Sequence, residues 1–168
     1  MTEEETGGKK ERMTPSNPYA SIIALLQEHH VPYTEREHDP MFTSDQEEEM
    51  TGLSAKQGIK SLLLKAKNEF VLVLLPGDKK LDTQKAKEAM KTKSFRFATE
   101  EEVQQVMGCA FGACYPFGSV AHLRTFADAS FSDSMLVACN PGVHDKSLLL
   151  SYQDFQRVEQ PSRAVMSQ

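Results

Sequence analysis

The sequence predicts an α+β fold with a mixed β-sheet in a single domain. Two apolar runs, 61–65 and 70–75, flank a polar turn at Lys67-Asn68, which is the pattern of a β-hairpin. Signals that begin helices are interspersed among these and further short apolar runs. Because the strands follow one another as hairpins and not as regular strand–helix–strand crossovers, the pattern favours an α+β class.

Four segments carry residues that typically begin helices. The expected N-terminal caps are Asn17 before Pro18, Ser44 with Glu47, Asp82, and Thr99 with Glu102. Gly108 follows the last of these helices, where a left-handed residue is usually required. Further short strands are expected at Phe95–Ala98, Leu123–Ala127, Met135–Ala138 and Leu148–Leu150.

The 168 residues are 39% apolar and 26% charged, which is ordinary for one globular domain. We expect a folded domain at 17–158, a mobile polar tail at 1–16 and a flexible C-terminal tail at 159–168. The longest apolar run, 70–75, is too short to cross a membrane, and the N-terminus lacks the apolar region of a secretory signal. Three cysteines without a dense framework fit a cytoplasmic protein.

The charge is unevenly distributed along the chain. Residues 1–55 and 97–168 are acidic, whereas residues 56–96 carry 11 Lys/Arg and 4 Asp/Glu. Such a basic middle segment can hold a phosphate backbone by displacing counterions. From charge alone, the simpler interpretation is that these lysines line the wet face of a helix.

The segment 108–118 is the most unusual stretch of the chain. Three glycines and a proline among apolar residues make a poor helix and a poor strand. Such a loop presents backbone N–H groups that suit an oxyanion, although a tight apolar turn has the same composition. It follows neither the phosphate-binding loop pattern nor the dinucleotide fingerprint.

Lys60 enters an apolar strand directly after Gly58-Ile59. A lysine at the mouth of a strand can reach a phosphate or a ribose, or it can extend its charged end to water at the sheet edge. The strand pattern alone leaves both roles open.

The cysteines and histidines show no metal-binding spacing. Cys109 and Cys114 are five residues apart with no matching pair of Cys or His, so we expect no metal and no cofactor. As a nucleophile, Cys114 requires a base such as His122 or His144, and sequence does not place either beside it.

An ordered set of motifs resembles the YbaK/prolyl-tRNA synthetase-associated editing family. The motifs are His38, Thr43-Ser44, Lys60-Ser61-Leu62-Leu63, Val73–Asp78, Leu81-Asp82, Phe95–Ala98, Glu101–Val103, Gly108–Gly118, Asp128, Gly142 and Ser151–Phe155. They cover about residues 17–158. The resemblance implies a mixed, curved sheet flanked by helices and no metal.

This family hydrolyses the ester that links a wrong amino acid to tRNA. The resemblance implies catalytic roles for Lys60, the family's strand lysine, and for the loop residues Gly112, Ala113 and Cys114. In the family, water activation is ascribed to the terminal ribose hydroxyl of the substrate together with loop backbone groups. The expected substrate-binding residues are Phe42, Thr43, Ser44, Tyr115, Pro116, Phe117, Gly118, Asp128 and His144. Phe42, Tyr115 and Phe117 are equally compatible with a core position.

The expected function is therefore trans-editing of mischarged tRNA that carries a small amino acid such as Ala, Cys, Ser or Thr. The expected partners are the acceptor end of tRNA and an aminoacyl-tRNA synthetase. Two alternatives stay open at this point: a non-catalytic module that binds tRNA or a synthetase, and the N-terminal editing domain of a longer prolyl-tRNA synthetase. The amino acid and the oligomeric state are not readable from the sequence.

Overall fold

The computed structural model describes residues 14–40 and 44–168. For residues 44–47 it describes the backbone but not the side chains. The helices are α2 (Pro18–Glu28), α3 (Ser44–Thr51), α4 (Thr83–Met90), α5 (Glu100–Met107) and α6 (Tyr152–Glu159). The strands are β3 (Thr34–Glu37), β4 (Ile59–Ala66), β5 (Glu69–Pro76), β6 (Arg96–Phe97), β7 (Arg124–Asp128), β8 (Leu136–Cys139), β9 (Lys146–Ser151) and β10 (Ser162–Ala164). Single 3₁₀ turns lie at η1 (Ala55–Gln57), η2 (Phe111–Ala113) and η3 (Gly118–Ala121).

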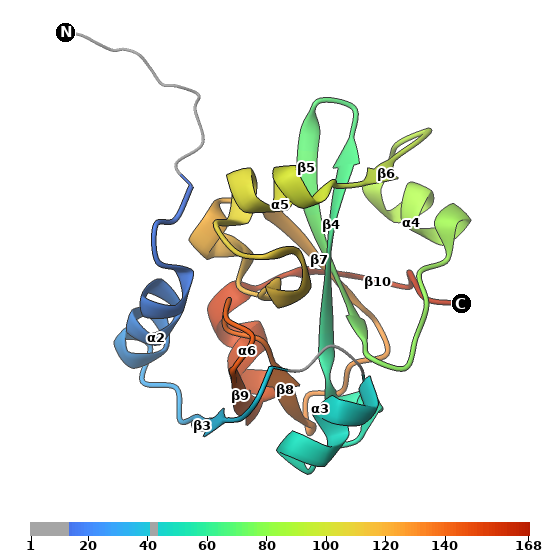
Figure 1. Ribbon diagram of the computed structural model, residues 1–168. Coiled ribbons are helices and arrows are strands. Elements are labelled where there is room, and N and C mark those ends of the chain that lie inside the picture. The colour runs from blue at the N-terminus through green and yellow to red at the C-terminus, as the bar shows by residue number, and fades with distance from the viewer. Residues whose placement is uncertain (1–13, 41–43) are drawn as a thin grey trace, which may run out of the picture.

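These strands form two sheets (Figure 1). The larger has the order β10-β7-β5-β4-β6, in which β4 runs antiparallel to β5 and β6 while β7 runs parallel to β5 and β10. The smaller, β3-β9-β8, is antiparallel. The predicted α+β class with a mixed sheet is therefore confirmed.

The β4–β5 hairpin divides the interior of the molecule. Its strands pair in register from Ile59 opposite Pro76 to Ala66 opposite Glu69, and Lys67 makes the turn with a left-handed φ of 57°. Successive side chains of β4 and β5 point to opposite faces of the sheet, so they belong alternately to two different hydrophobic clusters. One face carries the main core, and the other packs against α4.

The predicted helix caps are present wherever their side chains are described. The Asn17 side chain accepts from the N–H of Ala20 at 3.1 Å, and Asp82 accepts from Lys85 at 2.9 Å. Gly108 ends α5 with a φ of 69°. The helix expected from Ser44 is α3, but its expected Ser44–Glu47 cap lies outside the described side chains.

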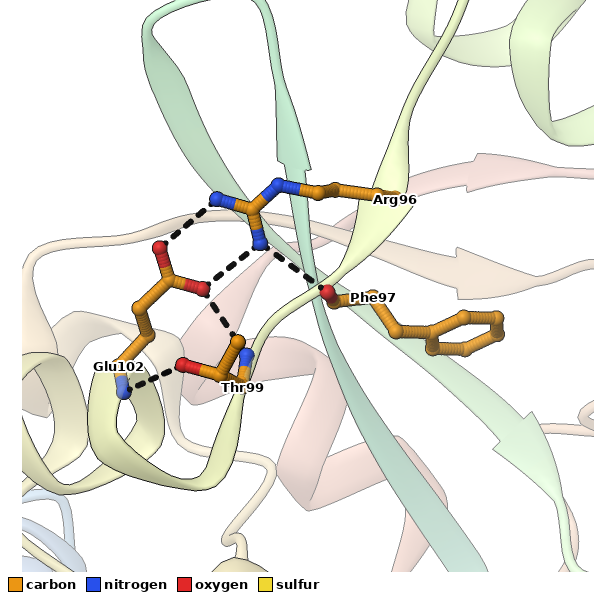
Figure 2. Close-up of polar contacts among 4 residues, drawn as sticks. All are labelled: Arg96, Phe97, Thr99 and Glu102. Atoms are coloured by element: carbon orange, nitrogen blue, oxygen red, sulfur yellow. Dashed lines mark hydrogen bonds and ion pairs between the residues drawn. The ribbon is translucent and has the colours of Figure 1, made fainter.

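Figure 2 shows the cap of α5, where a capping box and an ion pair share one carboxylate. The Glu102 carboxylate accepts from the backbone N–H of Thr99 at 2.9 Å and from two nitrogens of Arg96 at 2.8 Å each. These bonds, led by the one from Arg96, lower the pKa of Glu102 to about 2. The arrangement ties β6, at the edge of the sheet, to the helix that leads into the loop 108–118.

The C-terminal segment differs from the flexible tail expected at 159–168. Ser162–Ala164 form β10, which pairs parallel with β7, and the side chain of Met166 is fully buried. Three residues with no apolar alternation are too short a signal to predict a strand, so the partner strand β7 and the buried Met166 decide the outcome. The expected mobile tail falls mainly on residues 1–13, which lie outside the described residues.

Candidate functional site

The loop between α5 and β7 is fastened to the core by its aromatic residues. The Tyr115 hydroxyl donates to the carbonyl of Met107 at 2.8 Å, and the ring of Phe117 packs edge-on against Phe155 at 5.4 Å between centroids. Both side chains are fully buried. In this structure Tyr115 and Phe117 position the loop from within the core, and their substrate-binding roles stay predictions.

Close packing also explains why a glycine stands at the end of the loop. A Cβ on Gly118 would lie 1.9 Å from the Oγ1 of Thr125, so a glycine is required there for packing. Pro116 and Gly118 are both buried. Both residues therefore have a structural role in this loop, and their expected substrate-binding roles stay predictions.

The accessible part of the loop is its first turn. Phe111 and Gly112 are exposed and Cys114 is partly exposed, whereas Ala113 is buried. The N–H of Ala113 donates to the carbonyl of Ala110 at 2.9 Å and so cannot serve an oxyanion. Outside the 3₁₀ turn itself, no backbone acceptor is found among the described residues for the N–H groups of Gly112 and Cys114. These two N–H groups are therefore the candidates among the three expected backbone donors.

A second loop, 140–145, lies against this turn. A Cβ on Gly112 would approach the Cε1 of His144 to 3.0 Å, so the imidazole lies directly beside the glycine. A Cβ on Gly142, whose φ is 92°, would lie 3.5 Å from the Tyr115 ring. The structure thus brings together His144 and Gly112, two site residues that are 32 positions apart in the chain.

Cys109 and Cys114 lie at the two ends of the same turn, and the Cys114 thiol donates to the carbonyl of Phe111 at 3.4 Å. The interaction with Cys109 lowers the pKa of Cys114, and the same interaction together with burial raises the pKa of Cys109. Cys109 is buried, as is Cys139. Cys114 is therefore the most reactive of the three thiols.

We expect iodoacetamide at pH 8 to alkylate Cys114 first, because it combines partial exposure with a stabilised thiolate. Mass spectrometry of timed digests measures this order, and Cys114→Ser should remove the fast phase. Equal rates at Cys114 and Cys139 would contradict the assignment.

Lys60 is the second residue of β4 and is half-buried. Its Nζ donates to the backbone carbonyl of Lys79, in the turn after β5. Burial lowers the pKa of Lys60, Asp78 counteracts this effect, and Lys80 adds to it. Lys60 therefore lies in a small cationic region in which one acid is also present.

Ser61, the residue after Lys60, faces the other side of the sheet. Lys60 pairs with Leu75, which belongs to the cluster packed against α4, whereas Ser61 pairs with Leu74 of the main core. The loop's Tyr115 belongs to the main core as well. The structure thus gives Lys60 and the loop different faces, and Ser61 is the residue on the loop's side.

Ser61 is a candidate that the sequence did not single out. Its Oγ is buried and has no hydrogen-bond partner in the described residues. Buried hydroxyls are nearly always satisfied, so this one requires an explanation, and a bound substrate would supply one. The exposed ring of Phe111 was also missed, because a loop sequence does not reveal which of its apolar side chains faces water.

Asp128 is buried and fully engaged by the C-terminal segment and by Ser130. Its carboxylate is 1% exposed and accepts hydrogen bonds from the backbone N–H groups of Met166 and Ser167, each at 2.9 Å. Further hydrogen bonds come from Ser130 and from the Ser167 hydroxyl. Burial alone would raise its pKa, but these bonds outweigh burial and lower it. In this structure Asp128 anchors the C-terminal segment, and its substrate-binding role stays a prediction.

The remaining expected residues lie near the first loop after β3. Phe42 and Thr43 fall outside the described residues, and so does the side chain of Ser44. His38, just before them, donates from Nδ1 to the Asp39 carbonyl at 2.7 Å, because a carbonyl can only accept. Its Nε2 then accepts from the Ser147 hydroxyl at 2.9 Å in the neutral imidazole. This pair connects the end of β3 to β9, the strand that follows the His144 loop.

The described ranges 14–40 and 44–168 contain no group of three His, Cys, Asp or Glu side chains placed to hold a metal ion. None of their helices combines the length and the apolar character that a membrane crossing demands.

Comparison with known proteins decides the family. The model of the aminoacyl-tRNA editing domain matches residues 38–158, which is more than half of the chain. The chain belongs to the aminoacyl-tRNA editing domain family. The resemblance to the YbaK-type editing proteins is confirmed, and the matched range includes Lys60, the loop 108–118 and His144.

Relatives of this editing domain include free-standing proteins and parts of synthetases. The multifunctional Ser/Thr-tRNA deacylase ProXp-y of Escherichia coli K12 is 30% identical over 145 residues, which cover 83% of this chain and 87% of the relative. The prolyl-tRNA editing protein ProX of Acetoanaerobium sticklandii is 28% identical and covers 82% and 88%. The proline–tRNA ligase of Bacillus subtilis is 34% identical over 102 residues, 58% of this chain and 18% of the ligase.

A solved structure supports the same fold. A candidate trans-editing enzyme for prolyl-tRNA synthetase superimposes with a TM-score of 0.78 at 21% identity, over 93% of this chain and 99% of that one. At this identity the likeness bears on the fold alone.

Proposed function

We propose that this chain hydrolyses the ester between tRNA and a small, wrongly attached amino acid on free mischarged tRNA. The chain is an aminoacyl-tRNA deacylase, and tRNA is its substrate. The observation that carries the assignment is the editing-domain match, which contains the loop with its exposed Gly112. We place the protein in the cytoplasm, where mischarged tRNA arises, and its domain at about residues 17–168.

The chemistry we propose uses backbone groups of the first loop turn. An ester requires little activation, so a fixed water and donors to the developing oxyanion are sufficient. The N–H groups of Gly112 and Cys114 are the donors, since that of Ala113 is already bonded. The thiol of Cys114 is not required. Consistent with the family, the terminal ribose hydroxyl of the substrate helps to activate the water.

His144 forms the wall of this turn in our proposal. Its imidazole lies against Gly112, where it can contact the amino acid or orient the water. Lys60 acts on the other face, where an ammonium group can hold a phosphate or ribose of the tRNA acceptor end. Grip and hydrolysis are then tasks of two separate positions in the fold.

A second hydrolytic site is useful because synthetase pockets distinguish small apolar side chains only weakly. The names of two relatives include Ser/Thr-tRNA and prolyl-tRNA, so we propose a substrate of that class, and a synthetase as a supplier of mischarged tRNA.

A deacylation panel tests the proposal. Alanine, serine, threonine and cysteine are each attached to proline, alanine and threonine tRNA, and the loss of ester is followed with and without protein. We expect at least one small-residue substrate to be hydrolysed well above the buffer rate. Buffer rates on every substrate, together with retained tRNA binding, would favour the non-catalytic binding module instead.

Ser61→Ala separates a functional hydroxyl from a structural one. An unsatisfied buried hydroxyl destabilises the fold by about 1 kcal/mol or more, so the variant should unfold at the same or a higher temperature. If substrate satisfies Ser61, deacylation should fall about tenfold in kcat/KM. Thermal unfolding and steady-state kinetics measure the two effects, and a variant with lower stability and unchanged kinetics would contradict the role.

A further inference from the structure

The described surface includes a concavity between α4 and the turn of the β4–β5 hairpin, at the end of the sheet where β6 pairs. Its volume is about 720 Å³. Its lining residues are Lys67, Gln84, Lys87, Glu88, Lys91, Thr92, Lys93 and Ser94. We call it the lysine concavity. It belongs neither to the loop 108–118 nor to the surroundings of Lys60.

The lysine concavity is built almost entirely from donors. Four lysines face one acid, Glu88, and none of the four forms an ion pair with another described residue. Pockets for small molecules are lined mostly by apolar and aromatic side chains, and this one has none. Lysine, glutamine, serine and threonine side chains are instead the groups that contact nucleic-acid phosphates.

The backbone of the lysine concavity is held in place. Lys91 caps α4 in a left-handed conformation, and its N–H donates to the carbonyls of Lys87 and Glu88. The Thr92 hydroxyl donates to the carbonyl of Ser94 at 2.9 Å. The cations are therefore displayed on a fixed frame, which reduces the ordering that binding demands.

We propose that the lysine concavity binds the phosphate backbone of the tRNA acceptor stem, away from the reacting ester. This rests on the proposed function. Six residue steps along β4 separate Lys60 from Ala66, about 20 Å at ~3.3 Å per step. A duplex gripped at its end by Lys60 and along its side by the concavity is held at two points. The net positive charge of residues 56–96 would then serve to bind the tRNA backbone.

The test compares two double variants with the same net charge. Lys87→Gln/Lys91→Gln alters the lysine concavity, and Lys56→Gln/Lys146→Gln removes two cations elsewhere. Each is assayed with a full mischarged tRNA and with a short oligonucleotide that carries the same amino acid on the 3′ end alone. Binding of uncharged tRNA is measured separately at several salt concentrations.

We expect the concavity variant to raise KM for full tRNA about tenfold or more with kcat unchanged, and to leave the short substrate unaffected. The slope of log affinity against log salt should fall by about two, one for each lost phosphate contact. Equal behaviour of the two variants, or equal losses on both substrates, would overturn the proposal. If wild type hydrolyses nothing, the proposed function fails, but the binding and salt measurements still decide the concavity.

Discussion

Replacing Asp128 with alanine is expected to lower the free energy of unfolding by about 3 kcal/mol. The substitution leaves the buried N–H groups of Met166 and Ser167 without their acceptor and releases the segment that completes the sheet through β10. For a chain of this length the melting temperature should fall by roughly 6–12 °C. Thermal and urea unfolding measure the loss.

Two further measurements identify the cause of that loss. Asp128→Asn keeps an acceptor for the two N–H groups and should lose less stability than Asp128→Ala. The lowered pKa of Asp128 means that its contribution is complete above its unfolded pKa, about 4, and disappears as the pH falls through the folded value. The difference between wild type and Asp128→Ala should therefore shrink in acid. A constant difference down to pH 2, or wild-type stability of the alanine variant, would show that the anchor is unimportant.

Lys60→Ala is expected to reduce kcat/KM for deacylation by between about tenfold and a hundredfold, mostly through KM, because it removes a charged grip on the tRNA end. Folding should be almost unaffected, since the hydrogen bond that Lys60 makes is to a single carbonyl. Lys65→Ala, on the same strand, is the matched control. Kinetics of both variants on one hydrolysed substrate measure the effect, and equal rates for Lys60→Ala and Lys65→Ala would remove Lys60 from the site.

Local signals in the sequence predicted the elements that local chemistry decides. The caps at Asn17, Asp82 and Thr99 and the left-handed Gly108 each depend on residues within four positions, and all four are present. The β4–β5 hairpin was equally predictable, because its two apolar runs are joined by one short turn. The two-residue strand β6 is shorter than expected.

Features that depend on distant partners were not predictable. The strand β10 exists because β7 offers it an edge, and Asp128 is buried because residues 38 and 39 positions later bond to it. The family resemblance located the loop 108–118 but could not distinguish its exposed turn from its buried half. That division depends on Met107, Thr125 and Phe155, which only the folded chain brings to the loop.

Gly112→Ala tests the central claim, that the exposed turn beside His144 hydrolyses the ester. The added methyl group would meet the imidazole at 3.0 Å and displace it slightly, while the backbone conformation remains allowed to alanine. Ala110→Ser, which adds one atom to an exposed position of the same loop, is the control. We predict an unchanged melting temperature and a fall in kcat of about tenfold or more for Gly112→Ala alone. Wild-type kcat in a folded Gly112→Ala protein would contradict the account.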